Sequence, residues 1–146
     1  MNKFTKILGG VAAVAIIAFF AACSSPIDST QGSARAALSA TDTTTLVAGG
    51  TIGNVASSAA FTSGANSTVN GYVTAVAAVT LGANSRVNGN VTAGAAFTMG
   101  ATAVVTGNVN AVGDIVLGAN AHVLGSVHSG SGVITYGAGA TVGSIN

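Results

Sequence analysis

Few side chains in this 146-residue chain are able to do acid–base, nucleophilic or metal chemistry. Cys23 is the only cysteine, and the two histidines are His122 and His128. A nucleophilic site needs an oriented base beside the nucleophile, and no acidic residue accompanies either histidine in the sequence. A metal site needs ligands that converge to about 2 Å from the ion, and no third ligand joins the histidines. The sequence therefore predicts a protein that is not an enzyme, with solvent-facing histidines, no metal and no cofactor.

Charge is also scarce, because the chain has four cationic and three acidic residues and a formal net charge of +1. Lys3, Lys6 and Arg35 lie before residue 43, whereas Arg86 and Asp114 are the only charged residues after it. A nucleic-acid partner is excluded, since phosphates need clustered lysine or arginine. A nearly neutral surface favours association between copies over mutual repulsion.

Hydroxyl side chains recur at a regular spacing. Thr62, Thr80 and Thr98 follow one another at a constant spacing of 18, and Thr135 comes after an interruption at Val116. With the alanines that precede the first three by two residues, they predict a flat, weakly polar face for ice or a crystalline polysaccharide. Threonine also suits strands for its shape alone. A binding face and ordinary strand composition are therefore both open.

These threonines belong to an 18-residue repeat that fills the chain from about Thr43 to Asn146, with Leu81–Thr98 as one complete copy. Two glycine columns carry the period: Gly53, Gly71, Gly89, Gly107, Gly125 and Gly143 in one, and Gly64, Gly82, Gly100 and Gly118 in the other. Such spacing is typical of a solenoid, in which each unit buries its apolar side against its neighbours.

Each copy contains three pairs of small or apolar residues, and one outward residue separates the members of each pair. In one copy the pairs are Val79/Leu81, Ser85/Val87 and Val91/Ala93. Three short strands in every copy predict an all-β fold, a three-sided parallel β-helix of about six turns that rise about 4.8 Å each. The spacing alone leaves the handedness open.

Two kinds of residue mark the predicted corners. The glycines lie where the backbone needs a conformation that a side chain would hinder. Asn66, Asn84 and Asn120 share another corner column, in which we expect stacked amides to bond one another.

The last copy is irregular, because Ser129–Gly132 contains one extra residue and Thr141–Gly143 lacks one. Irregular end turns are expected where a stack stops. We expect the edge of this turn, with Val142 and Ile145, to be open and to pair with another copy of the chain.

The N-terminal range 1–22 is predicted to be a signal helix, with a basic start and an uncharged run that is short for a membrane span of about 20 residues. It ends in Phe20-Ala21-Ala22-Cys23, which resembles the lipobox of bacterial lipoproteins. The resemblance implies cleavage before Cys23 and its lipidation, and several acyl chains hold a protein to a membrane. Ser24 resembles the pattern sent to the outer membrane of a Gram-negative bacterium. The alternative is an ordinary secretory signal with a chance cysteine.

The range 23–42 holds the only proline and no periodicity, and it is predicted to be a flexible polar linker before the solenoid domain 43–146. Within it, Ala34–Ala40 has helical propensity and offers an alternative, a helical cap on the first turn.

The segment Gly89–Val109, GNVTAGAAFTMGATAVVTGNV, resembles the repeat of the bactofilins, polymer-forming β-helical proteins of bacteria. The resemblance implies a right-handed helix whose uncapped ends stack into filaments. Val79-Thr80-Leu81-Gly82 is similar to the last turns of the secreted ice-binding β-helix family. The stretches LGANSR and LGANAH resemble the repeats of left-handed β-helical acyltransferases, but that family prefers small residues where this chain has Phe97, Ile115 and Val127.

Together, these features predict a non-enzymatic, membrane-anchored structural lipoprotein of the cell envelope. Its β-helix is expected to associate with other copies into a scaffold or surface fibre. The alternative is a surface-binding protein that uses the threonine and alanine face to hold ice or an ordered glycan.

Overall fold

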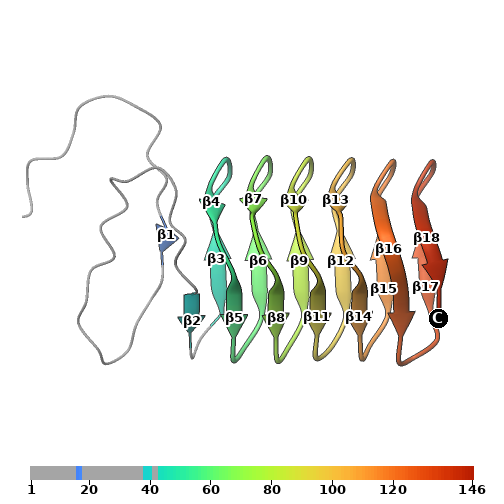
Figure 1. Ribbon diagram of the computed structural model, residues 1–146, viewed down its shortest axis with the longest axis horizontal. Coiled ribbons are helices and arrows are strands. Elements are labelled where there is room, and N and C mark those ends of the chain that lie inside the picture. Colours follow the sequence, from blue (N-terminus) through green and yellow to red (C-terminus); the bar gives the residue numbers. More distant parts are fainter. Residues whose placement is uncertain (1–15, 18–37, 41–42) are drawn as a thin grey trace, which may run out of the picture.

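The computed structural model describes residues 16–17, 38–40 and 43–146. Successive turns of chain stack into a rod, with the strands of each turn beside those of the next (Figure 1). Every regular element among the described residues is a β-strand. Within this part of the chain, no helix is long and apolar enough to cross a membrane. The predicted all-β solenoid is confirmed.

Each turn contributes one strand to each of three sides of the coil. Side 1 consists of β3 (Thr44–Leu46), β6 (Phe61–Ser63), β9 (Val79–Leu81), β12 (Phe97–Met99), β15 (Ile115–Leu117) and β17 (Ile134–Tyr136). Side 2 consists of β2 (Leu38–Ala40), β5 (Val55–Ser57), β8 (Val73–Ala75), β11 (Val91–Ala93), β14 (Val109–Ala111) and the second halves of β16 (His122–Ser129) and β18 (Thr141–Ile145). Side 3 consists of β4 (Thr51–Ile52), β7 (Thr68–Val69), β10 (Arg86–Val87), β13 (Val104–Val105) and the first halves of β16 and β18. The six strands of side 1 mark six turns, about 28 Å of rod at the spacing of neighbouring strands.

The register of the parallel strands follows the repeat. In the central turns the pairing joins positions at a spacing of 18, as for Phe97 and Ile115. The first turn is one residue shorter, since Thr51 pairs with Thr68. In the last turn Ile115 pairs with Ile134, one position further on than the repeat requires, whereas Val127 pairs with Ile145 at the regular spacing. The predicted extra residue and the predicted missing residue of the last copy are therefore both confirmed.

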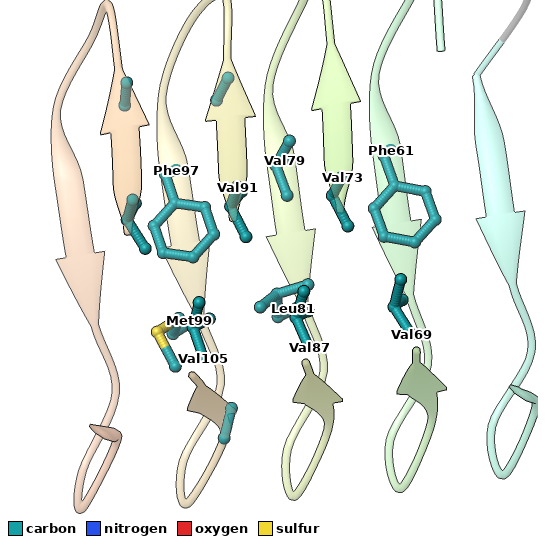
Figure 2. Close-up of a cluster of buried hydrophobic side chains, with 14 of the residues drawn as sticks. Phe61, Val69, Val73, Val79, Leu81, Val87, Val91, Phe97, Met99 and Val105 are labelled. Atoms are coloured by element: carbon teal, nitrogen blue, oxygen red, sulfur yellow. The ribbon is translucent and has the colours of Figure 1, made fainter. Parts of the chain in front are cut away.

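The core is a stack of the predicted inward pairs. In the central turns, strand residues of sides 1 and 2 alternate between buried and outward positions. Phe97 and Ile115 are completely buried and Met99 is 1 % exposed. Figure 2 shows the rings of Phe61 and Phe97 inside the coil, beside valines of side 2. Burying each large apolar side chain stabilises the fold by about 1.5–3 kcal/mol, so the stacked columns hold the turns together.

The boundary of the solenoid differs from the sequence-based one. β2 pairs in parallel with β5, so side 2 begins inside the range 23–42 that was assigned to the linker. These three residues form a strand rather than part of a helical cap. Ile16–Ile17 forms β1, which pairs antiparallel with β3. The rest of 1–42, including Cys23, lies outside the described residues.

The corner glycines have a different cause from the predicted one. A Cβ atom on Gly100 would lie 2.6 Å from the backbone nitrogen of Ala83, so glycine is needed because adjacent turns approach closely. The left-handed conformation occurs in the other corner column instead, with φ values of 55° at Asn84, 58° at Thr102 and 54° at Asn120. Asparagine tolerates this conformation, whereas a β-branched residue such as Thr102 does so at a cost.

Side-chain amides do connect the turns, but mainly in a column that the sequence did not single out. The Oδ1 atoms of Asn54, Asn90 and Asn108 each accept a backbone N–H bond from the residue 18 positions later, at 2.9–3.2 Å. In the predicted column the hydroxyl of Thr102 donates to Oδ1 of Asn84. Backbone donors left at the corners are thereby satisfied by the turn below.

Candidate binding and association surfaces

The predicted threonine row is a straight line along the outer surface of side 1. Thr62 pairs with Thr80, Thr80 with Thr98, Thr98 with Val116 and Val116 with Thr135, each at the outward central position of its strand. Because neighbouring strands are about 4.8 Å apart, these side chains repeat at that interval. The structure thus brings all four predicted threonines into one row.

The row is longer than predicted, because Thr45 pairs with Thr62 and continues it by one strand. The signal was present in the sequence: the spacing from Thr45 to Thr62 is one position short of the repeat, as it is from Thr51 to Thr68. The extended row holds five threonines and one valine, and we call these six residues the threonine row. The alanines that flank it at positions 60, 78 and 96 are half-buried, so small side chains border the hydroxyls.

The last turn is open. Tyr136 continues the inward column of Leu117, and Ile145 continues that of Val127. Leu117 is 1 % exposed and Val127 completely buried, but Tyr136 is 41 % and Ile145 60 % exposed. Val142, the other predicted association residue, is partly buried against the core. We call the inward residues of this turn the open end: Ile134, Tyr136, Ala140, Val142 and Ile145.

Apolar exposure extends from the open end onto side 1. Val116, which interrupts the threonine row, is 39 % exposed, and Val133, just before β17, is 50 % exposed. The chain from residue 115 to residue 146 contains no Asp, Glu, Lys or Arg. The C-terminal end of the rod therefore presents exposed apolar side chains without Asp, Glu, Lys or Arg. It is rimmed by the free edges of β17 and β18, which among the described strands pair only with β15 and β16.

The two histidines lie on different sides of the coil, as their spacing predicts. His122 pairs with Val104 on side 3 and His128 with Asn110 on side 2, and both imidazoles are exposed. Each reaches up to the last turn: Nδ1 of His122 lies 2.6 Å from Oγ1 of Thr141, and Nδ1 of His128 donates to the carbonyl oxygen of Asn146 at 2.7 Å. They hold the last turn in place rather than forming a joint site.

Asp114 takes part in the corner that accommodates the extra residue of the last copy. The hydroxyl of Ser131 donates to its Oδ1 at 2.5 Å, and Ser129 donates to the carbonyl of Gly113 at 2.9 Å. The other charged residue of the solenoid, Arg86, donates through Nε to Asn88 at 2.7 Å on side 3. The structure gives both charged side chains local structural partners and does not bring them together with the histidines.

Chemistry-bearing residues do not converge in the described part of the chain. Among residues 16–17, 38–40 and 43–146, no group of three or more His, Cys, Asp or Glu could hold a metal ion. Cys23 lies outside these ranges, so its lipidation stays a prediction. The surfaces that the fold does assemble are the threonine row and the open end.

Comparison with known proteins adds no relative: no protein-family model matches the chain, and neither a curated protein nor a solved structure matches it. The candidate surfaces are therefore interpreted from their geometry and chemistry.

Proposed function

We propose that this protein is a non-enzymatic structural lipoprotein of the cell envelope. It is anchored through a lipidated Cys23, in the outer membrane of a Gram-negative bacterium, and its solenoid associates with other copies into a scaffold or surface fibre. The observation that carries the proposal is the open end, where the core columns of the rod reach solvent at Tyr136 and Ile145.

Three physical features favour association at this end. Exposed apolar side chains at the top of a packed column gain roughly 25 cal/mol for each Å² of apolar surface that a partner covers. The free edges of β17 and β18 present backbone N–H and C=O groups that another strand can pair with. Residues 115–146 contain no Asp, Glu, Lys or Arg side chain that would oppose the approach of a second copy.

Sedimentation of the full chain in a mild detergent tests this proposal. We expect oligomers whose share increases with concentration, and we expect Val142→Lys combined with Ile145→Glu to abolish them. The control variant, Val76→Lys with Tyr72→Glu, changes exposed residues in the N-terminal half of the rod and should associate normally. A monomer at every concentration, or equal loss in both variants, would contradict self-association through the open end.

The anchor is tested separately by fractionating cells that express the full chain. The lipobox resemblance predicts that the protein sediments with membranes and incorporates labelled fatty acid. Cys23→Ala should lose the label and leave the membrane fraction, whereas Cys23→Ala protein that stays bound would argue for another means of attachment.

A second candidate function, binding to ice or an ordered glycan, is favoured by one observation. Thr45 lengthens the threonine row to six positions on one straight side, with the interruption confined to Val116. Thr80→Tyr with Thr98→Tyr should abolish adsorption to ice or to crystalline polysaccharide. Thr74→Tyr with Thr92→Tyr, at outward positions of side 2 in the same turns, is the matched control. Adsorption that survives the first pair would rule out the row as the binding surface.

A further inference from the structure

The corner between sides 3 and 2 carries two asparagine–glycine pairs, one turn apart. Asn70–Gly71 and Asn88–Gly89 occupy equivalent places at a spacing of 18, and both asparagine side chains are exposed. The glycines are required by packing, since a Cβ atom on Gly89 would lie 2.7 Å from the carbonyl oxygen of Gly71. The fold therefore keeps a residue without a side chain directly after each of these exposed amides.

An asparagine that precedes glycine can lose ammonia from its side chain. The backbone nitrogen of the next residue attacks the side-chain carbonyl carbon, and glycine has no Cβ atom to hinder this approach. Neither the N–H of Gly71 nor that of Gly89 donates a hydrogen bond within the described residues. By contrast, the N–H of Val91 donates to the carbonyl oxygen of Asn108 at 2.8 Å, so the attacking nitrogen beside exposed Asn90 is already engaged.

A chain of hydrogen bonds distinguishes the two amides that precede glycine. Nε of Arg86 donates to Oδ1 of Asn88 at 2.7 Å, and Nδ2 of Asn88 donates to Oδ1 of Asn70 at 3.1 Å. Negative charge develops on Oδ1 during the attack, and a donor already aimed at that oxygen lowers the barrier. A guanidinium does this better than a neutral amide, because a hydrogen bond from a charged donor is stronger. Asn88 is therefore the more activated of the two.

We propose that Asn88 is a site of self-modification, at which Arg86 promotes deamidation. The nitrogen of Gly89 bonds to Cγ of Asn88, its proton passes to solvent, and the Cγ–Nδ2 bond breaks with release of ammonia. Water then opens the resulting succinimide ring, at one carbonyl carbon to give aspartate and at the other to give isoaspartate. Water is the only co-reactant, and no atom is oxidised or reduced.

Either product changes this corner of the rod. A carboxylate at position 88 neutralises Arg86, one of only two charged residues after position 43. Isoaspartate also adds one CH₂ group to the main chain directly before Gly89, where the preceding turn lies too close for a Cβ atom. We expect this product to loosen the stacking of the two turns, so that the modification marks aged copies and weakens the middle of the rod.

The test incubates the folded full chain in a mild detergent and in water enriched in heavy oxygen, and then locates the label by peptide mass spectrometry. Only conversion during the incubation incorporates the label, which separates it from earlier damage. We expect label first at Asn88, more slowly at Asn70 and none at Asn90. Arg86→Gln should slow the conversion of Asn88 about tenfold, less than the loss for a buried oxyanion donor because water reaches this corner. It should leave the rate at Asn70 unchanged.

Two controls make the outcomes distinct. His122→Gln, at the outward position of side 3 two turns after Arg86, should leave the conversion of Asn88 unchanged. In the chain unfolded in urea, both asparagine–glycine pairs should react at similar rates, because the bond from Arg86 is lost. Conversion of Asn88 in urea but not in the folded chain would overturn the proposed site. Equal rates at Asn88 in the wild type and in Arg86→Gln would overturn its promotion by Arg86, and with it the proposal.

Discussion

The central turns and the last turn of this solenoid are built from the same columns of inward side chains, but the central turns bury these side chains and the last turn leaves several exposed. Val91 and Val127 are at most 1 % exposed, whereas Ile145 at the end of their column is 60 % exposed. In a solenoid each turn packs only against its neighbours, so the contribution of a side chain to the free energy of unfolding depends on whether a further turn covers it. The position of a residue along the rod therefore affects this contribution as much as the residue type does.

The same difference applies to irregularity. The central turns keep a strict spacing of 18, while the last turn contains an extra residue before β17 and a register shift in the pairing of β16 with β18. A turn with a neighbour on one side only can shift to accommodate such changes. A turn between two others cannot do so without separating them.

The largest effect is expected from Phe97→Ala. Phe97 is completely buried between turns, and removing its ring should cost about 3–5 kcal/mol of the free energy of unfolding. Ile134→Ala, in the same column at the open end, should cost only about 1–2 kcal/mol because the side chain is already partly exposed. Equilibrium urea unfolding followed by circular dichroism measures both. Equal losses would show that the last turn is as well covered as the central ones.

A second comparison uses two glycines of one column. The Cβ atom introduced by Gly100→Ala would lie 2.6 Å from backbone atoms of the preceding turn. We expect the free energy of unfolding to fall by about 1–3 kcal/mol, because the turns on both sides resist movement. Gly137→Ala meets backbone at the same 2.6 Å, but its turn is free to shift outward. Its loss, from the same unfolding measurement, should be the smaller of the two. The reverse order would contradict the view that the last turn is adjustable.

A change that stabilises a central turn is expected at Thr102. This β-branched residue has a φ of 58°, in a column where Asn84 and Asn120 have the same conformation at less cost. Thr102→Asn should raise the free energy of unfolding by about 1 kcal/mol, visible as a higher thermal midpoint. Asn84→Thr is the reverse exchange and should lower it by a similar amount. A lower midpoint for Thr102→Asn would show that its hydroxyl bond to Asn84 outweighs the strain.

The smallest effect concerns the attachment of the last turn. His128→Ala removes the bond to the carbonyl of Asn146, and an exposed hydrogen bond contributes at most about 1 kcal/mol. We expect faster amide hydrogen exchange in β18 and no change in β12. Asn110→Ala, one turn lower in the same column, should leave β18 unaffected. Faster exchange throughout the rod would mean that His128 supports more than the last turn.

Much of the candidate surface could be predicted because outward residues follow the same period as the core. Once Phe97 and Met99 are inward, Thr98 must be outward, and its partners one turn away must be Thr80 and Val116. Thr45 was missed because the first copy is one residue short, so a fixed spacing of 18 passes over it. The histidine bonds to the last turn could not be predicted, since they depend on side-chain geometry across the stack.

The sequence by itself determined the solenoid, the three strands of each turn and the inward and outward alternation, because strict spacing at 18 and period-2 alternation allow only one way to bury the apolar columns. Only the tertiary structure decided that glycine serves close approach at Gly100 while left-handed backbone occurs at Asn84, since the first depends on the distance between turns and the second on how the chain turns at that corner. It also decided how far the inward residues of the outermost turns are buried, with Leu46 1 % exposed and Ile145 60 % exposed. Burial there depends on which segments pack over the outermost strand, and the repeat period does not specify them.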